Sequence, residues 1–259
     1  MFHRILIACV QFILLMWLFG CSPAAENPVI FQEDFEQGIL DSSRWEVTIE
    51  GDFADFLVDV YDVDVNEDTD YRLRLQANTI GTSDPLKFLG VRSMKELDFS
   101  TGRAVTFDLD WNDQANGCYL TASLYLCPTV SSNPKNESNW LKFEYTGVPP
   151  GRNVRINIWE KIDGVVKQLH TDWGPRDGQG RPIGKPLGFD NHRVEILLEK
   201  NSLRVLQDGA EIYCLSKHNL NFATAYIYLQ MSSGTNYPSR EVYFDNILVQ
   251  SISPDIDHS

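Results

Sequence analysis

The residues in the middle of the chain that could best carry out chemistry are aromatic and charged side chains on short, alternating segments. The aromatic candidates are Trp140, Tyr145, Trp159 and Trp173. The polar candidates beside them are Asp110, Lys142, Glu144 and Arg155. Aromatic faces stack against the apolar face of a sugar ring, while carboxylates and amides bind its hydroxyl groups. These residues indicate a carbohydrate-binding groove; the alternative is that the aromatic rings pack in a core.

The sequence lacks the motifs of other common catalytic sites and of phosphate-binding loops. The chain has no Gly-x-Ser-x-Gly element, and its histidines and cysteines lack the spacing of metal ligands. The segment Gly174–Gly188 has five glycines and three prolines, but Pro186 stands where a phosphate-binding loop needs serine or threonine. We expect a loop at the rim of the fold.

Two acidic segments also lack a recognised functional pattern. Asp108 and Asp110 alternate with apolar residues, which is typical of the polar side of a half-buried strand. A run of carboxylates follows Asp59, but counting an EF-hand loop from Asp62 places Glu67 where glycine is needed. We therefore expect an acidic strand edge and turn there.

The charge balance excludes nucleic acid as a partner. The chain of 259 residues has 22 Lys and Arg against 36 Asp and Glu, giving a net charge of −14. A protein that neutralises a run of phosphates needs the opposite balance. Hydrophobic residues make up 43% of the chain, which allows a sizeable core and excludes a disordered polypeptide.

The first twenty residues have the pattern of a signal peptide. His3 and Arg4 precede an apolar stretch, residues 5–19, that is shorter than the roughly 20 residues of a transmembrane helix. The following Leu-Phe-Gly-Cys21 resembles the lipobox of bacterial lipoproteins. This resemblance implies a signal peptide at 1–20, a lipid on Cys21, a tether at 21–29 and anchoring in the bacterial cell envelope. The alternative is an uncleaved N-terminal anchor.

The cysteines of the mature chain allow at most one internal disulfide. They are Cys118, Cys127 and Cys214, an odd number. Residues 118–127 are predicted to form one strand, which would separate the first two of these residues by about 30 Å. We expect three buried free thiols.

Alternating apolar and polar residues predict an all-β chain of about a dozen strands. The clearest segments are 71–77, 105–111, 194–198, 203–205, 225–231 and 242–249. Asp208-Gly209 between two such segments predicts a hairpin. Without a linker or a change in composition, these segments predict a single antiparallel two-sheet β-sandwich of jelly-roll type over 30–251, with a C-terminal tail at 252–259.

The two ends of this sandwich resemble the concanavalin A-like lectin/glucanase superfamily. Residues 31–45, with Phe31-Gln-Glu-Asp-Phe35 and Arg44-Trp45, resemble its opening strand and turn. Val194–Tyr213 resembles its strand–turn–strand, and Val242–Val249 resembles the closing strand that pairs with the first. The superfamily includes laminarinase-type hydrolases and laminin-G-like modules, so the resemblance implies an oligosaccharide or polysaccharide partner or an adhesive role.

In laminarinase-type hydrolases, a central strand carries three acidic residues with alternating spacing. Asn139–Gly147 is the best match, and its Glu144 corresponds to the acid/base, but Trp140 and Lys142 occupy the earlier acidic positions. Hydrolysis needs two carboxylates. We expect a glycan-binding protein without catalysis; the alternatives are a divergent hydrolase or lyase that uses Glu144, and a structural or protein-binding module.

The resemblance also implies a structural calcium ion near the end of the chain. Asp245 occupies the position of the closing-strand carboxylate, and Glu33 or Asp34 is expected to approach it. The alternative is that Asp245 and Asn246 only cap the pairing of the strands.

Overall fold

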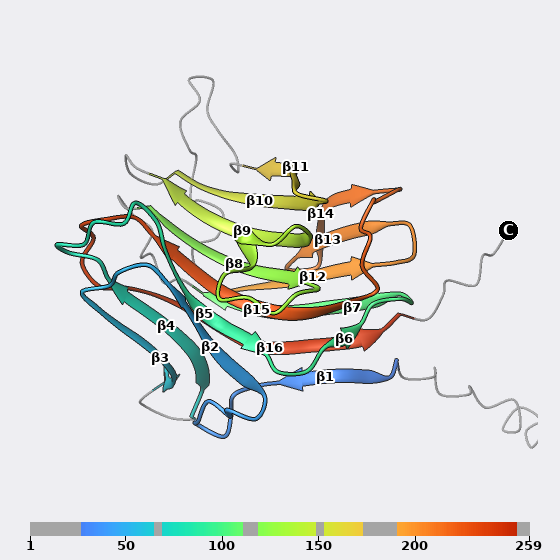
Figure 1. Cartoon of the computed structure of the whole chain (residues 1–259). Helices are drawn as coiled ribbons and strands as arrows, with labels where there is room; N and C mark the ends of the chain where they lie inside the picture. The colour runs from blue at the N-terminus through green and yellow to red at the C-terminus, as the bar shows by residue number, and fades with distance from the viewer. Residues whose placement is uncertain (1–26, 65–68, 111–118, 149–152, 173–190, 253–259) are drawn as a thin grey trace, which may run out of the picture.

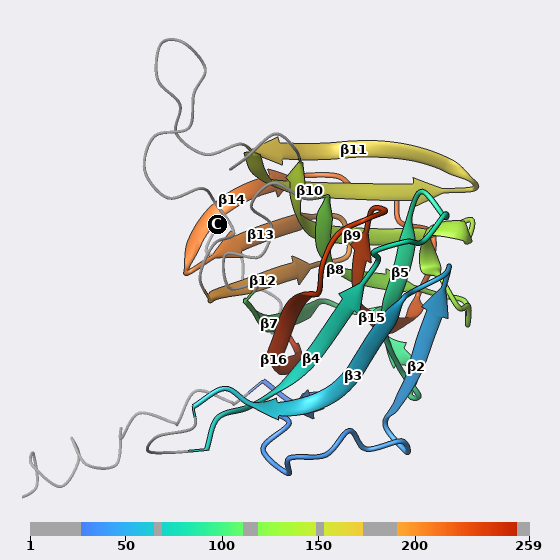
Figure 2. The same cartoon turned by 90° about the vertical axis from the view of Figure 1, so that its left-hand side faces the viewer.

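The computed structural model describes residues 27–64, 69–110, 119–148, 153–172 and 191–252, which form two antiparallel sheets packed face to face (Figure 1). Sheet A runs in the order β14 (Ala210–Leu215), β13 (Leu203–Gln207), β12 (His192–Leu198), β7 (Arg103–Asp110), β16 (Arg240–Ser251), β4 (Tyr71–Asn78) and β3 (Asp55–Asp62), and β1 (Val29–Glu33) pairs with β16. Sheet B runs in the order β11 (Val165–Asp172), β10 (Asn153–Ile162), β9 (Trp140–Val148), β8 (Leu120–Cys127), β15 (Thr224–Ser233), β5 (Lys87–Ser93) and β2 (Trp45–Glu50), and β6 (Leu97–Asp98) pairs with β15. Figure 2 shows the two layers from the side.

The predicted all-β sandwich is confirmed, as are the pairings expected at its two ends. β1 pairs with β16 in antiparallel register, with Phe31 opposite Val249, and the two strands lie side by side in Figure 1. Asp208 and Gly209 have φ angles of 51° and 77° and form the tight turn between β13 and β14. Two consecutive positive φ angles are typical of the hairpin turn predicted from this dipeptide.

Alternation along β9 decides which of its side chains face the core. Leu141, Phe143 and Tyr145 point between the sheets, where the ring of Phe143 lies 5.8 Å from that of Phe107 of sheet A. Because successive side chains of a strand point to opposite faces, Lys142 and Glu144 lie on the outward face of sheet B.

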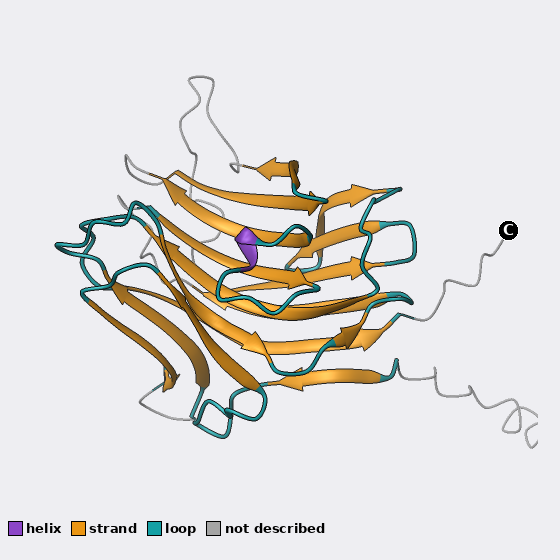
Figure 3. Cartoon of the chain, viewed as in Figure 1, coloured by secondary structure: helices purple, strands orange, loops and turns teal. Residues whose placement is uncertain are grey.

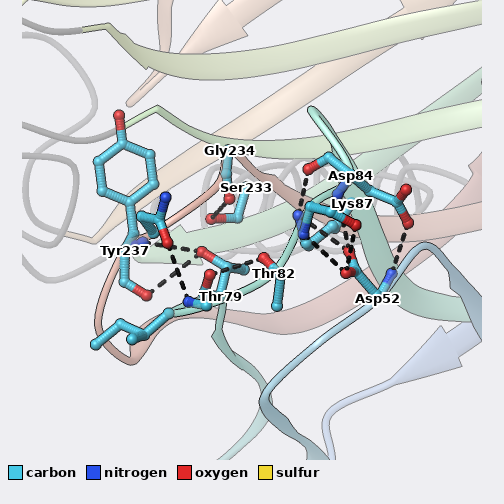
Figure 4. A network of polar contacts seen from close by, with 12 residues as sticks. Asp52, Thr79, Thr82, Asp84, Lys87, Ser233, Gly234 and Tyr237 are labelled. Atoms are coloured by element: carbon cyan, nitrogen blue, oxygen red, sulfur yellow. Dashed lines mark hydrogen bonds and ion pairs between the residues drawn. The ribbon is translucent and has the colours of Figure 1, made fainter.

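A polar network fastens three loops at one end of the sandwich (Figure 4). The side chain of Lys87 has no exposed surface, and its Nζ atom lies 3.3 Å from Oδ1 of Asp52. Asp52 and Asp84 each accept a hydrogen bond from the other's backbone N–H, at 3.1 and 2.9 Å. Nearby, the backbone N–H of Tyr237 donates to Oγ1 of Thr79 at 3.0 Å. Lys87 is therefore buried because it holds these loops together, and its burial needs no catalytic or binding role.

The cysteine prediction is corrected in one respect. Cys127 and Cys214 are free thiols, but only Cys127 is buried, whereas Cys214 is exposed on β14. The predicted signal peptide, the lipobox residue Cys21, Cys118, Trp173 and the glycine-rich segment 174–188 lie outside the described residues. Within the part of the chain that the structure describes, no helix has the length and apolar character needed to cross a membrane.

Candidate functional site

The outward face of sheet B carries a band of polar side chains across its centre. Strand register places Ser123 opposite both Glu144 and Gln230, and Glu144 opposite Asn157. Residues that pair directly in antiparallel strands share a face of the sheet. We call the following residues the polar face: Ser123, Lys142, Glu144, Asn157, Trp159 and Gln230.

Glu144 is the centre of the polar face and is only 6% exposed. Its Oε1 atom accepts hydrogen bonds from Nε1 of Trp159 and from Nδ2 of Asn157, both at 2.9 Å. Its Oε2 atom forms an ion pair with the ammonium group of Lys142. Burial alone would raise the pKa of Glu144, but the Lys142 charge and these hydrogen bonds outweigh it and lower the pKa.

Lys142 is fixed as firmly as its partner. Its Nζ atom lies 5.0 Å from the ring centroid of Tyr125, in addition to the ion pair with Glu144. Burial would lower the pKa of Lys142, yet the Glu144 carboxylate raises it above its ordinary value. Both groups are therefore charged at neutral pH.

This state of Glu144 does not suit a glycosidase acid. The general acid of such an enzyme must hold a proton, which requires a raised pKa, and a second carboxylate must stand nearby. Glu144 is instead held ionised, and the two preceding outward positions of β9 are Lys142 and Trp140. The arrangement can accept hydrogen bonds and position a ligand, and among the described residues that form the polar face Glu144 is the single carboxylate.

The structure places the other predicted binding residues in three different environments. Arg155, opposite Thr146, shares the outward face of sheet B with the polar face. Tyr145 has no exposed surface and lies in the core, where its hydroxyl donates to Oε1 of Gln207 at 2.8 Å. Asp110 lies on β7 of sheet A. The expectation that Tyr145 and Asp110 line the same groove as Glu144 is therefore corrected.

Trp140 faces outward but is packed rather than open to a ligand. It is 3% exposed, and its ring meets that of Tyr125 edge to face at 5.6 Å. With Cys127 and Tyr228 it forms a second, smaller apolar cluster on the outside of sheet B. For this tryptophan, core packing is the correct interpretation.

A loop that the sequence analysis did not place covers part of this surface. Residues 128–138, here called the strap, include the short 3₁₀ turn η1 (Pro134–Asn136), purple in Figure 3. The backbone N–H of Ser131 donates to the Tyr228 hydroxyl at 2.9 Å. Nζ of Lys135 lies 5.2 Å from the ring centroid of Phe88 on β5. Its serines, asparagines and prolines are typical of a loop, but no sequence pattern shows where this loop packs.

On sheet A, three carboxylates from distant segments converge. Glu36, Asp70 and Asp245 each have an oxygen within 4.8 Å of the others. Burial, followed by the nearby Asp70, raises the pKa of Asp245 to about 7. Neither of the partners expected from sequence belongs to this group, in which Glu36 and Asp70 take their place. Glu33 accepts a hydrogen bond from Nε1 of Trp45 at 3.1 Å, and Asp34 accepts one from the backbone N–H of Glu36 at 3.3 Å.

A set of carboxylate oxygens has the donor chemistry that suits calcium. Arg72 donates to both oxygens of Asp70, at 3.1 and 2.5 Å, and offsets part of the negative charge. In the calcium interpretation, Glu36 and Asp245 would supply most of the ligand oxygens, because neither forms an ion pair within the described residues.

Calcium is expected to stabilise the protein at pH 8 through Asp245. At a concentration ten times the dissociation constant, binding to the folded state adds about 1.4 kcal/mol, which corresponds to a rise of about 4 °C in Tm for a domain of this size. Differential scanning fluorimetry with calcium and with EDTA measures this rise. The same rise in Asp245→Asn would place the ion elsewhere.

Comparison with known proteins bears on the fold. No protein-family model and no curated protein matches the sequence. A Bacteroides ovatus mixed linkage glucan GH16 in complex with a product is 13% identical, with a TM-score of 0.59 over 85% of this chain and 100% of that one. The chain has the concanavalin A-like jelly-roll fold.

Further neighbours show how varied the proteins with this jelly roll are. A LamA variant from Z. galactanivorans, in complex with laminaritriose and laminaritetraose, is 14% identical, with a TM-score of 0.59 over 87% of this chain and 99% of that one. The globular domain of T. cruzi calreticulin is 15% identical, with a TM-score of 0.53 over 87% of this chain and 89% of that one. At such identities the likeness establishes the fold alone.

Proposed function

We propose that the chain is an exported, lipid-anchored protein that binds a poly- or oligosaccharide and does not cleave it. The observation that carries the proposal is the state of Glu144 on the polar face. It is ionised, paired with Lys142 and bonded to Trp159. The outward positions before it on β9 hold no carboxylate, so binding is the chemistry that remains.

The proposed ligand contacts combine one aromatic ring with fixed amide groups. Trp159 is half-buried, and its hydrogen bond to Glu144 fixes the orientation of its indole ring. Nε2 of Gln168 donates to Oδ1 of Asn157 at 3.0 Å, so the amide beside Glu144 is also held in place. Fixed side chains lose little conformational entropy when a ligand binds. Similar jelly rolls with bound sugars, such as the LamA variant with laminaritriose, support this function.

Trp159→Ala is expected to weaken glycan binding by about tenfold or more, because truncating a central aromatic residue of an interface typically costs over about 1.4 kcal/mol. Affinity electrophoresis in gels containing single polysaccharides measures the retardation. Trp159→Phe keeps an aromatic face but loses the donor to Glu144, so it should retain most of the binding.

The matched control is Tyr61→Ala, which removes a partly exposed aromatic residue from the outward side of sheet A. This variant should bind as the wild type does. Equal retardation of all variants would place the ligand away from the polar face. No retardation by any polysaccharide would favour a structural or protein-binding module instead.

The proposed anchor depends on the lipid-modified Cys21. After expression in a bacterium, the full chain is expected to partition into the detergent phase of Triton X-114. Cys21→Ala cannot receive the lipid, so any cleaved form of this variant is expected in the aqueous phase, and the rest is expected to remain as uncleaved precursor. Cys214→Ala, which changes an exposed thiol on β14, is the control. Detergent partitioning of a cleaved Cys21→Ala chain would contradict the anchor.

A further inference from the structure

Most described cations of this acidic chain have a carboxylate partner. Among the described residues, eleven ion pairs join a lysine or an arginine to an acidic side chain, such as Arg74 with Asp59 at 2.7 Å and Arg204 with Glu211 at 2.8 Å. Because the chain has 36 acidic residues against 22 basic ones, a basic side chain is expected to have a carboxylate nearby. A group of basic residues that lacks it is therefore informative.

Two lysines without such a partner meet beside the polar face. Nζ of Lys161, on β10, donates to the backbone carbonyl of Lys135 in the strap at 3.2 Å. The Lys135 ammonium lies over the Phe88 ring. Neither lysine forms an ion pair with a described residue, and Lys135 is exposed to solvent.

The polar face adds no net negative charge beside these lysines. The carboxylate of Glu144 is already neutralised by Lys142, so it does not offset the strap. Partial desolvation and the ammonium groups of Lys142 and Lys161 lower the pKa of Lys135, partly opposed by Glu144 and by Glu50, which accepts a hydrogen bond from Asn136 of the strap and forms no ion pair with Lys135. The lysines are thus close enough to repel one another.

We propose that the glycan bound at the polar face is anionic, carrying carboxylate or sulfate groups that pair with Lys135 and Lys161. This inference rests on the proposed glycan binding and names its ligand class. Trp159 lies two residues before Lys161 on β10, so the two side chains point to the same face of sheet B. In this proposal Trp159 stacks on a sugar ring, while the lysines bind its acidic substituents. An anion placed there would give both lysines the acidic partner that most described cations already have.

The test uses two matched pairs of polysaccharides at fixed low salt. Polygalacturonate is compared with its highly methyl-esterified form, and dextran sulfate with dextran, so that carboxylate and sulfate are distinguished. The full chain is expected to bind the charged member of at least one pair at least tenfold more tightly than the neutral member. Raising the salt concentration should weaken this binding.

Substitutions assign the effect to the two lysines. The double variant Lys135→Ala/Lys161→Ala is expected to lose at least tenfold in affinity for the charged ligand, and Lys135→Arg/Lys161→Arg should restore it. Lys200→Ala, which removes an exposed lysine from a turn of sheet A, is the charge-matched control and should bind normally.

The outcomes separate this inference from the proposed function. Equal affinity for charged and neutral glycans, lost in Trp159→Ala but unchanged in the double lysine variant, would overturn the anionic ligand and leave glycan binding intact. Charged-ligand binding that survives the double variant would also overturn it. Failure to bind any of the four polymers or any other polysaccharide would overturn both.

Discussion

Lys142→Met is expected to lower the free energy of unfolding by about 3 kcal/mol. Methionine fills a similar volume, but it leaves the Glu144 carboxylate buried without its cation. Breaking a buried ion pair by removing one partner typically costs about 3–5 kcal/mol. The loss is at the low end because Trp159 and Asn157 still donate to Glu144. Urea denaturation of both proteins at pH 7 measures it.

The double variant Lys142→Met/Glu144→Gln is the matched control. It removes both charges, and glutamine can still accept hydrogen bonds at Oε1, so most of the lost stability should return. Lys161→Met removes a lysine from the next strand and should change stability by less than about 0.5 kcal/mol. A double variant as unstable as Lys142→Met would show that packing of the lysine chain, not the charge pair, causes the loss.

Asp245→Asn is expected to change the dependence of stability on pH. The pKa of Asp245 is about 7 in the folded protein against an ordinary 3.8. A group with a raised folded pKa contributes stability that is complete below its unfolded pKa and is lost as the pH rises through its folded pKa. The wild type should therefore lose up to about 4 kcal/mol from this group between pH 4 and pH 8.

Asparagine cannot ionise, so the variant lacks this loss. In EDTA, the variant is expected to be more stable than the wild type at pH 8, and the difference should vanish or reverse near pH 4. Urea denaturation of both proteins at several pH values gives the difference between their free energies of unfolding. The titration of all other groups is common to both proteins and cancels in this difference. Asp55→Asn, on the exposed edge strand β3, is the control. A difference that does not vary with pH would contradict the assigned cause.

The local sequence patterns determined most of the fold. Alternation identified strands such as β4 and β7, and the Asp208-Gly209 turn fixed a hairpin, because these depend on neighbours in the chain. Alternation also contained the evidence that Tyr145 is buried. It follows Glu144 directly, and adjacent side chains of a strand point to opposite faces. Tyr145 and Glu144 therefore cannot line the same groove.

Other features of the site depend on contacts between distant segments. Glu36, Asp70 and Asp245 meet because the turn after β1 and the residue before β4 both lie beside β16, and no spacing in the sequence marks that meeting. The strap illustrates the same limit, since only the folded chain places Lys135 over Phe88. Asp110 lies away from Glu144 because β7 belongs to the other sheet, which depends on strand order rather than local pattern.

The central claim, that the polar face binds a glycan without cleaving it, is tested most directly by isothermal titration calorimetry with a polysaccharide that retards the protein. We predict heats that saturate and return to baseline after each injection, with an affinity at least about tenfold lower in Trp159→Ala. A steady thermal power after each injection, abolished in Glu144→Gln, would show turnover and contradict the claim.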